Sequence, residues 1–597
     1  TFIDNLYTNV REDGSIHLFL FQNAVHDYKF GYDKSTETLV DPYDGLAPGA
    51  AVSIKNVNSS LNYYPKAPTS LDFFQNVGVG YSIQVSSFAD SNGDGLGDLK
   101  GITNNLDYLA YDLNVKVLWL TPFLLSDSYH GYDVIDYYTI DPKFGTMEDF
   151  QELVFEAHKR GMRILMDFVV NHTSANNSWF KKSTQLDPEY RNFYHWGYGS
   201  EFASKSHWYQ YSTTGYYYYG KFSSSMPELN FDYQGTRDAV VDVALYWMSF
   251  GLDGFRVDAV KHFYNEGEYD IQTRGENDIL HMEPGWSRNA TKNINVFMEL
   301  NARIKAVFPN AFLIGENFDG NPANLGPYYA GMDSQFNFNL YFELVQTGLY
   351  RANNANTLAR VYGFNNNAAR LYRGDVFIES SMTSNHDITR LLNHAAGQKI
   401  VNAANQIDSI RKAKVISAVN LTLPGISWIY YGDELGMSGI KTNNIFYDQL
   451  GNKIGENDWH ADRWFRQPFK FSIEKTSQTT GFQFETYSVE WDAYNILLPG
   501  VAQQRFDNNS MLRHYMALTQ LKANHPVLIQ GTFEPLTTTD TNLFAFKRVH
   551  QGVTFYVYHN LSAATVTNYS LGGNTIVWNS TGSSIQSIAP YGSIIIR

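Results

Sequence analysis

The sequence predicts an α/β fold built on a closed (β/α)8 TIM barrel. Three observations lead to this prediction. Eight short apolar runs alternate with helical segments, a long stretch rich in Tyr and Ser follows the third run, and the last part of the chain alternates apolar and polar residues. We therefore expect a barrel with an inserted subdomain after strand 3, a C-terminal antiparallel β-sandwich and a small N-terminal β-rich module.

The barrel strands are predicted from apolar runs of strand length that precede turn residues or helical patterns. In chain order they are Tyr81–Val85, Lys116–Leu120, Arg163–Val169, Gly254–Asp258, Phe312–Glu316, Ser334–Leu340, Val376–Met382 and Ser427–Tyr431.

Changes in these patterns give the expected domain boundaries. The N-terminal module covers 1–73, the barrel 74–530 and the β-sandwich 531–597. Two inserts interrupt the barrel: a subdomain at 173–232, and an aromatic-rich segment at 441–507 whose role the sequence leaves open.

Composition excludes several classes of function. The net charge of −15 argues against a nucleic-acid partner, because a phosphate backbone would be repelled. The chain has no cysteine, which excludes disulfides and thiol catalysis, and no apolar run long enough to predict a transmembrane segment. Aromatic residues form 16% of the chain, which favours a carbohydrate ligand or an aromatic core equally. The oligomeric state is open.

The stretch "FADSNGDGLGDLKGI" has the spacing of a calcium loop. Its oxygen donors would be the side chains of Asp90, Asn92, Asp94 and Asp98 and the Leu96 carbonyl. A calcium sensor loop would end in a glutamate where this loop has glycine, so we expect a structural site rather than a sensor. A solvated turn without metal is the alternative.

Polar residues gather where four of the predicted strands end. In a barrel of this kind the carboxyl ends of the strands form one face, which carries the reactive groups. Its predicted members are Asp167, Asp258, Glu316 and Asp387, with Arg256, His172 and His386 beside them.

Two of these carboxylates are in surroundings that suit glycoside cleavage. The alternation of a strand places Arg256 on the same side as Asp258, so that its charge would keep this carboxylate ionised, as a nucleophile requires. Glu316 ends an apolar strand, where burial would keep it protonated, as a general acid requires. A pair of this kind cleaves a glycosidic bond.

At these residues the chain resembles the α-amylase family, glycoside hydrolase family 13. The likeness spans Tyr81 to Arg597 and rests on "DFVVNH", "GFRVDAVKH", "GENF" and "SMTSNHD", together with "DSYHGYDVIDYYTID", "MPELN" and "LPGISWIYYGDELGM". It is closest in appearance to bacterial outer-surface starch amylases and to the oligo-1,6-glucosidase and neopullulanase branch.

The resemblance implies a retaining hydrolase with Asp258 as nucleophile, Glu316 as acid/base and Asp387 as third carboxylate. Asp167 would bind substrate or only brace the site. The residues implied to contact or orient the sugar are Tyr132, His130, Asp133, His172, Arg256, Lys261, His262, His386 and Arg390. The resemblance also assigns a structural calcium ion to Asp90, Asn92, Asp94, Leu96 and Asp98.

The bond that is cleaved is less clearly indicated. "DAVKH" is similar to enzymes that cleave α-1,4 bonds, whereas the calcium-type loop and "MPELN" resemble the α-1,6-cleaving branch. We expect an α-1,4-glucan hydrolase acting on starch or maltodextrin. The alternatives are an α-1,6-glucosidase, neopullulanase or glucan transferase, and more remotely a non-catalytic glucan-binding homologue. An extracellular or cell-surface location is expected, with a cytoplasmic one as the alternative.

Overall fold

The computed structural model describes most of the chain from residue 72 onward. The described ranges are 72–263, 286–319, 325–338, 355–363, 378–440, 461–480, 493–567 and 572–597. Residues 341–342, 345 and 569 are also described, as are nine separate strands, β1 to β5 and β19 to β22, whose bounds are given below.

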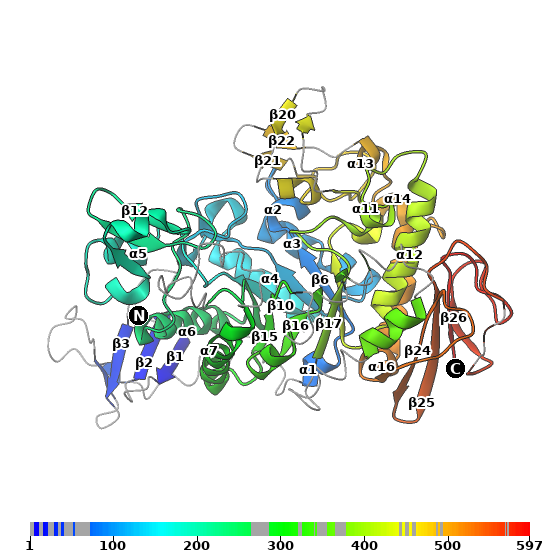
Figure 1. The fold of residues 1–597 in the computed structure, drawn as a ribbon, viewed down its shortest axis with the longest axis horizontal. Coiled ribbons are helices and arrows are strands. Elements are labelled where there is room, and N and C mark those ends of the chain that lie inside the picture. Colours follow the sequence, from blue (N-terminus) through cyan, green and yellow to red (C-terminus); the bar gives the residue numbers. More distant parts are fainter. Residues whose placement is uncertain are drawn as a thin grey trace.

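Eight parallel strands form a closed barrel, as the sequence predicts. Figure 1 shows several of them at the centre of the molecule, between the inserted subdomain and the C-terminal sheet. Around the barrel the order is β10-β14-β15-β16-β17-β18-β6-β7. The strands are β6 (Val79–Ile83), β7 (Val117–Leu120), β10 (Arg163–Phe168), β14 (Gly254–Val257), β15 (Phe312–Gly315), β16 (Ser334–Phe336), β17 (Ile378–Met382) and β18 (Ile426–Tyr430).

The predicted strand ends differ slightly from the observed ones. β6 begins two residues before the predicted start, while β14 and β15 each end one residue before Asp258 and Glu316. These two carboxylates therefore stand just beyond the strands, at the start of the loops. Leu340 and Val376, which the prediction included in strands, lie outside the described residues.

Helices cover the barrel, and their limits follow local signals. In α4 (Met147–Lys159), Thr146 and Asp149 form a capping box, with acidic residues in the first turn and basic ones in the last. The other longer helices are α3 (Leu99–Asn104), α6 (Gln234–Ser249), α7 (Trp286–Val307), α12 (Gln406–Thr422) and α15 (Met511–Asn524). Shorter ones are α1 (Asp72–Gln75), α2 (Val85–Phe88), η2 (Tyr108–Asp112), η3 (Pro142–Phe144), η7 (Gly326–Ala330), α11 (Leu391–Ala395), η11 (Asp433–Leu435) and α16 (Pro526–Ile529).

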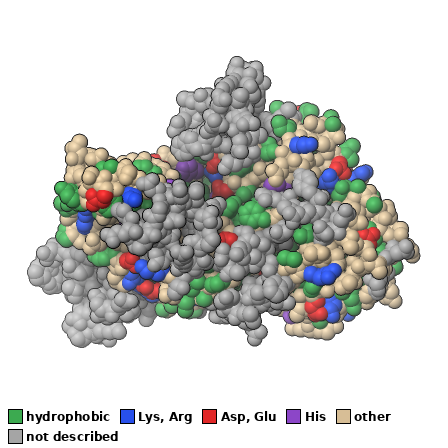
Figure 2. Space-filling view, viewed as in Figure 1, with side chains coloured by type: hydrophobic (Ala, Val, Ile, Leu, Met, Phe, Trp, Pro, Cys, Tyr) green, Lys and Arg blue, Asp and Glu red, His purple; other side chains and the backbone are tan. Residues whose placement is uncertain are grey.

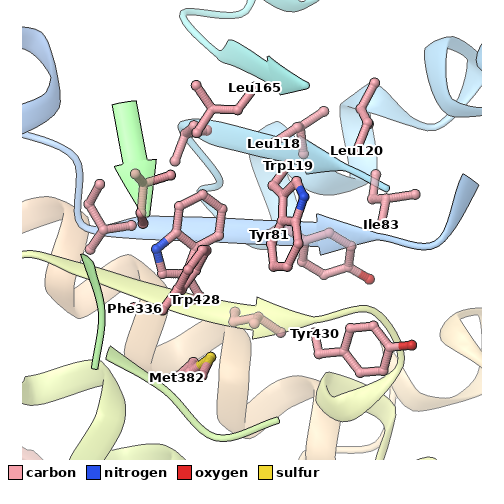
Figure 3. Packing of buried hydrophobic residues seen from close by; sticks show 14 of the residues in the cluster. Tyr81, Ile83, Leu118, Trp119, Leu120, Leu165, Phe336, Met382, Trp428 and Tyr430 are labelled. Atoms are coloured by element: carbon pink, nitrogen blue, oxygen red, sulfur yellow. The ribbon is translucent and has the colours of Figure 1, made fainter. Parts of the chain in front are cut away.

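Large side chains fill the barrel interior. Figure 3 shows Trp119, Phe336 and Trp428 packed between the strands, and the Trp119 and Phe336 rings lie 5.1 Å apart. Gly80 makes room for this packing, because a Cβ atom there would lie 2.6 Å from the Trp428 ring. The barrel is thus a packed core, and its chemistry is confined to one end.

The inserted subdomain projects from one side of the barrel (Figure 1, left). It holds a three-stranded antiparallel sheet in the order β11-β13-β12. Its elements are α5 (Ser178–Thr184), η4 (Arg191–Phe193), β11 (Trp196–Tyr198), η5 (Ser200–Ser204), β12 (Trp208–Tyr211) and β13 (Tyr216–Tyr219). Before it, β8 (Leu124–Ser126) pairs with β9 (Val134–Ile140).

Antiparallel sheets lie at both ends of the chain. The N-terminal one has the order β1-β2-β3-β4-β5, and β1 lies against α6 and α7 (Figure 1). Its strands are β1 (Asn5–Val10), β2 (Ile16–Phe21), β3 (Lys29–Asp33), β4 (Thr38–Val40) and β5 (Val52–Ser53).

The C-terminal sheet, in the order β23-β24-β25-β27-β26, confirms the predicted antiparallel domain. It contains β23 (Thr532–Pro535), β24 (Leu543–His550), β25 (Val553–Asn560), β26 (Ile576–Asn579) and β27 (Ser593–Ile596).

The second insert follows β18, and the elements among its described residues are short. They are β19 (Ile445–Tyr447), β20 (Lys453–Glu456), η12 (Ala461–Phe465), β21 (Phe482–Phe484), β22 (Tyr487–Val489), α13 (Ala493–Leu497) and α14 (Val501–Gln504). The domain boundaries expected at 73/74 and 530/531 stay predictions.

In the part of the chain that is described, no helix is both long and apolar enough to cross a bilayer.

Candidate active site

The predicted carboxylates converge at one end of the barrel. Asp167 lies in β10, in register with Arg256 of the neighbouring strand β14. Asp258 and Glu316 directly follow the adjacent strands β14 and β15, and Asp387 lies in the loop after β17. Parallel strands end at the same edge, so the chain order of these strands brings the acidic groups together.

A cavity of about 640 Å³ opens over these carboxylates. Figure 2 shows carboxylate and histidine side chains gathered in the upper middle of this face. Eight predicted site residues line it: His130, Tyr132, His172, Asp258, Lys261, His262, Glu316 and Asp387. The remaining lining residues are Tyr129, His207, Lys221, Phe222, Ser223, Met226, Ala259, Phe318, Asp462 and Arg466.

Arg256 joins three carboxylates beneath the cavity. Its Nη1 atom lies 2.5 Å from Asp258 Oδ1 and 2.7 Å from Asp167 Oδ1, and its Nη2 atom lies 3.6 Å from Glu316 Oε2. The guanidinium is fully buried. A buried cation in this position pairs directly with the Asp258 carboxylate and orients it.

Glu316 is held in its protonated form near neutral pH. Burial raises the pKa of this carboxyl to about 8, against the opposing charge of Arg256. The backbone N–H of Ala259 donates to Glu316 Oε2 at 2.9 Å, and Ala259 has a φ of 50°, in the left-handed region. The loop after β14 therefore bends to place a donor on the acid, which fixes its position.

Asp387 has the opposite electrostatic environment. Burial alone would raise its pKa, but His386, Arg466 and Arg256 together lower the pKa of Asp387 well below its ordinary value. His386 Nε2 lies 3.0 Å from Asp387 Oδ2, and Arg466 Nη2 lies 2.9 Å from Asp387 Oδ1. The third carboxylate is thus ionised throughout the physiological pH range.

Tyr132 forms a flat surface on the cavity wall. Its hydroxyl lies 2.5 Å from His386 Nε2 and donates to Asp167 Oδ2 at 3.0 Å. The Tyr132 and His386 rings are nearly parallel, with an angle of 8° between their planes. His172 Nε2 bonds the Tyr132 carbonyl at 2.8 Å. These contacts hold an aromatic ring beside the carboxylates, where a sugar can pack on it.

Asp167 braces this network from below. Trp119 Nε1, Tyr132 and Arg256 all donate to its two oxygens, and Asp167 does not line the cavity. Burial raises the pKa of Asp167 to about 6, with Arg256 opposing this shift. Of the two expectations for Asp167, the structure fits the bracing role.

Asp133 and Arg390 are placed differently from the expectation that they bind substrate. Asp133 accepts hydrogen bonds from the Ser128 backbone and hydroxyl, so it shapes the loop that carries Tyr132. Arg390 is fully buried and donates to the Tyr431 carbonyl at 2.7 Å. Neither residue lines the cavity. Both residues lie close in sequence to residues that line the cavity, but only some side chains of each loop reach it.

Several lining residues have no counterpart in the sequence analysis. The inserted subdomain contributes His207, Lys221 and Phe222, and the second insert contributes Asp462 and Arg466. Arg466 Nη2 lies 2.6 Å from Asp462 Oδ2, and the Tyr129 hydroxyl donates to Asp462 Oδ1 at 2.6 Å. The sequence does carry a local signal for the Asp462–Arg466 pair, because an acidic and a basic residue stand at i and i+4.

The loop predicted to bind calcium is folded tightly around its own polar groups. Asp90 accepts from the backbone N–H groups of Asn92, Gly93 and Gly95 at 2.7–3.0 Å. Asp98 caps α3 by accepting from Gly101 at 2.6 Å. Within the described ranges, no group of three or more His, Cys, Asp and Glu side chains is arranged to hold a metal ion.

Comparison with known proteins agrees with this geometry. The family model described as "Alpha amylase, catalytic domain" matches residues 82–531. "Alpha-amylase 3" of Dictyoglomus thermophilum is 32% identical, with 87% of this chain and 92% of the relative covered. "Oligo-1,6-glucosidase" of Halalkalibacterium halodurans is 28% identical, with 81% of this chain and 89% of the relative covered.

Solved structures show the same relationship. The crystal structure of the α-amylase from H. orenii has a TM-score of 0.65 and 30% identity, covering 87% of this chain and 99% of that one. The isomaltulose synthase from Klebsiella sp. LX3, at 22% identity and a TM-score of 0.71, shares the fold and covers 87% of this chain and 98% of its own. With the converging carboxylates and the matched catalytic domain, this chain belongs to the α-amylase family of glycoside hydrolases, glycoside hydrolase family 13.

Proposed function

We propose that this enzyme hydrolyses α-1,4-glucosidic bonds of starch, maltodextrin or related oligosaccharides with retention of configuration. The observation that carries the proposal is the contrast between Asp258 and Glu316. Both carboxylates contact Arg256, yet burial keeps Glu316 protonated while Asp258 is paired directly with the guanidinium at 2.5 Å. One group is thus prepared to donate a proton and the other to attack.

In the first half of the reaction, Glu316 gives its proton to the glycosidic oxygen while an Asp258 oxygen bonds to the anomeric carbon. The bond between that carbon and the leaving oxygen breaks, and the shortened chain departs. Asp387, held by His386 and Arg466, accepts hydrogen bonds from sugar hydroxyls, while the Tyr132 ring packs on the sugar face.

In the second half, Glu316 is ionised and acts as a base. It takes a proton from water, the water oxygen bonds to the anomeric carbon, and the bond to Asp258 breaks. The enzyme returns to its starting protonation state. Two successive displacements give a product with the α configuration of the substrate.

Bond preference is the finer part of the proposal. Lys261 lines the cavity with Glu316, and its Nζ donates to the Phe318 carbonyl at 2.5 Å, which fixes a cation beside the acid and supports the α-1,4 preference implied by "DAVKH". The alternative, α-1,6 cleavage or glucan transfer, has support from relatives named oligo-1,6-glucosidase and 4-alpha-glucanotransferase. The non-catalytic alternative is disfavoured by the complete carboxylate set.

The test is release of reducing sugar from soluble starch, pullulan and isomaltose, with Asp258→Asn as the inactive control. We expect activity on soluble starch, with α-anomeric product seen by proton NMR. Preferential release from isomaltose would assign α-1,6 specificity, and chain lengthening of maltotriose would assign transfer. Activity that survives in Asp258→Asn, or β-anomeric product, would refute the mechanism.

We also propose that the loop at 90–98 binds a structural calcium ion. Calcium prefers oxygen donors, and Asp90, Asn92, Asp94, Asp98 and the Leu96 carbonyl supply five within nine residues. Asp90 Oδ2, Asp94 Oδ1 and both Asp98 oxygens each accept one backbone N–H and keep a second lone pair for a cation, whereas Asp90 Oδ1 accepts two. The ion would hold the loop between α2 and α3 and take no part in the chemistry.

A further inference from the structure

One face of the small sheet in the inserted subdomain is entirely aromatic. Strand residues alternate between the two faces of a sheet, and the register pairs Trp196 with Tyr218 and Tyr198 with Tyr216. On the other side of β13, Tyr209 pairs with Tyr218 and Tyr211 with Tyr216. The residues on this face are therefore Trp196, Tyr198, Tyr209, Tyr211, Tyr216 and Tyr218.

The aromatic face is buried at one end and open at the other. Tyr218 is only 8% exposed and contacts Phe180, whereas Tyr198 is 66% exposed. Trp196, Tyr211 and Tyr216 are half-buried. We call the open part, formed by Trp196, Tyr198, Tyr211 and Tyr216, the tyrosine face.

The rings of the tyrosine face are held in fixed positions. The Tyr198 and Tyr216 rings lie 4.9 Å apart, and the Trp196 and Tyr211 rings lie 6.0 Å apart. The Arg191 guanidinium lies 4.0 Å from the Trp196 ring centre and 4.8 Å from that of Tyr216. The side chain of Arg191 also donates to the Ser183 carbonyl, which fixes this cation over the rings.

The opposite face of the same sheet is packed. Trp208, Tyr217 and Tyr219 form a small core with Phe202. The subdomain thus has a small core of its own on this side. On the other side, Trp196 and Tyr211 pack partly against the main core, and Tyr198 extends into solvent. Exposed aromatic residues gathered in this way mark binding surfaces.

We propose that the tyrosine face binds a segment of α-glucan at a second site, separate from the catalytic cavity. The proposal rests on the proposed function, since the ligand is the polymer that the enzyme cleaves. A glucan is uncharged and presents flat C–H faces bordered by hydroxyl groups. Tyrosine rings offer an apolar surface with a hydroxyl at the edge, which matches both parts of such a ligand.

The position of the sheet connects this site to catalysis. The residues that line the cavity from this subdomain include His207 next to β12 and Lys221 and Phe222 after β13. A glucan held on the tyrosine face is thereby kept on the subdomain that forms one wall of the cavity. The expected advantage applies to long or insoluble glucans and not to short oligosaccharides.

The test is retardation in native gels that contain soluble starch, using Asp258→Asn protein so that the polymer is not digested. The double variant Tyr198→Ala/Tyr216→Ala in this background should lose at least about tenfold in apparent affinity. Tyr198→Phe, which keeps the ring, should bind like its parent. Tyr111→Ala is the matched control, because Tyr111 lies on η2 with a comparable exposure of 67%.

Activity assays with the catalytically intact protein complete the test. The double variant should hydrolyse maltotriose as the parent does but degrade granular starch several-fold more slowly. Equal retardation of the double variant and its parent would overturn the proposal, as would an equal loss in Tyr111→Ala. A change from dimer to monomer in light scattering would show that a second copy covers the face, and would also overturn it.

Failure of this proposal differs visibly from failure of the proposed function. If the tyrosine face does not bind glucan, hydrolysis of soluble starch persists and only the retardation result changes. If the enzyme does not hydrolyse α-glucans, all intact variants are inactive on starch while retardation by the polymer is unaffected. Melting temperatures of the variants within a few degrees of the parent exclude misfolding as the cause.

Discussion

The Arg466 guanidinium lies 2.9 Å from the Asp387 carboxylate, although the two residues come from different loops of the barrel. Asp387 follows β17, whereas Arg466 belongs to the insert after β18. Arg466 is almost completely buried, also contacts Asp462, and donates from Nε to the His386 carbonyl at 2.9 Å. The second insert therefore helps to position the third carboxylate of the active site.

Replacing Arg466 should impair catalysis more than folding. We expect Arg466→Gln to lower kcat/KM on maltotriose by about 10- to 100-fold, because Asp387 loses a charged partner and its fixed orientation. Arg466→Lys should retain part of the activity, since it keeps the charge. Arg505→Gln, which removes an exposed ion pair with Asp112, is the control and should leave kcat/KM unchanged. Equal activity of Arg466→Gln and the parent would contradict this role.

The alkaline limb of activity should follow Glu316. Burial raises the pKa of this acid from 4.5 to about 8, and catalysis requires the protonated form. We expect kcat/KM to fall above about pH 8. The folded state holds this proton where the unfolded state has lost it, so the stability contribution of Glu316 is lost as pH rises toward 8.

Glu316→Gln provides the matching stability measurement. The variant cannot ionise at this position, so its melting temperature relative to the parent should be higher at pH 9 than at pH 5. A difference that does not change between these pH values would show that Glu316 titrates normally in the folded state.

Removal of calcium should lower thermal stability without changing the chemistry. We expect excess chelator to reduce the melting temperature by several degrees, and added calcium to restore it. Asp90→Asn should make melting insensitive to chelator, because Asp90 accepts three backbone N–H groups and is central to the loop. Lys100→Gln, on the exposed part of the next helix, is the control. Unchanged melting in chelator would count against a bound ion.

The contact between the barrel and the C-terminal sheet should weaken in acid. His559 is fully buried, with Nε2 3.0 Å from Thr422 Oγ1 of α12 and Nδ1 2.8 Å from Ser593 Oγ of β27. Burial, and to a smaller extent His514, lower the pKa of His559 to about 3. The unfolded chain binds a proton below about pH 6.5 that the folded protein excludes, so stability is lost as pH falls from 6.5 toward 3.

His559→Gln tests this origin of acid sensitivity. The variant should lose less stability between pH 7 and pH 4.5 than the parent in urea unfolding, although it is less stable at pH 7. His550→Gln, at the end of β24, is the control and should keep the parental dependence. Identical pH dependence in His559→Gln and the parent would show that other groups cause it.

Local patterns in the amino-acid sequence predict the barrel and the convergence of its carboxylates. Each barrel strand is a local apolar run, and Asp258 and Glu316 directly follow strands that are neighbours in the barrel. Local hydrophobic patterns fix the strands, and the geometry of a closed parallel barrel brings their carboxyl ends together. Strand alternation predicts that Arg256 and Asp258 lie on the same side of the strand, whereas their roles are what the family resemblance implies.

Which loop side chains reach the cavity depends on contacts between loops that are far apart in the sequence. Tyr129 meets Asp462 across 333 residues of sequence, and Asp133 and Arg390 do not line the cavity although residues close to them in sequence do. Loop paths have no periodic signal in the sequence. They are set by how the hydrogen-bonding groups of each loop find partners on neighbouring loops, which only the folded chain brings within reach.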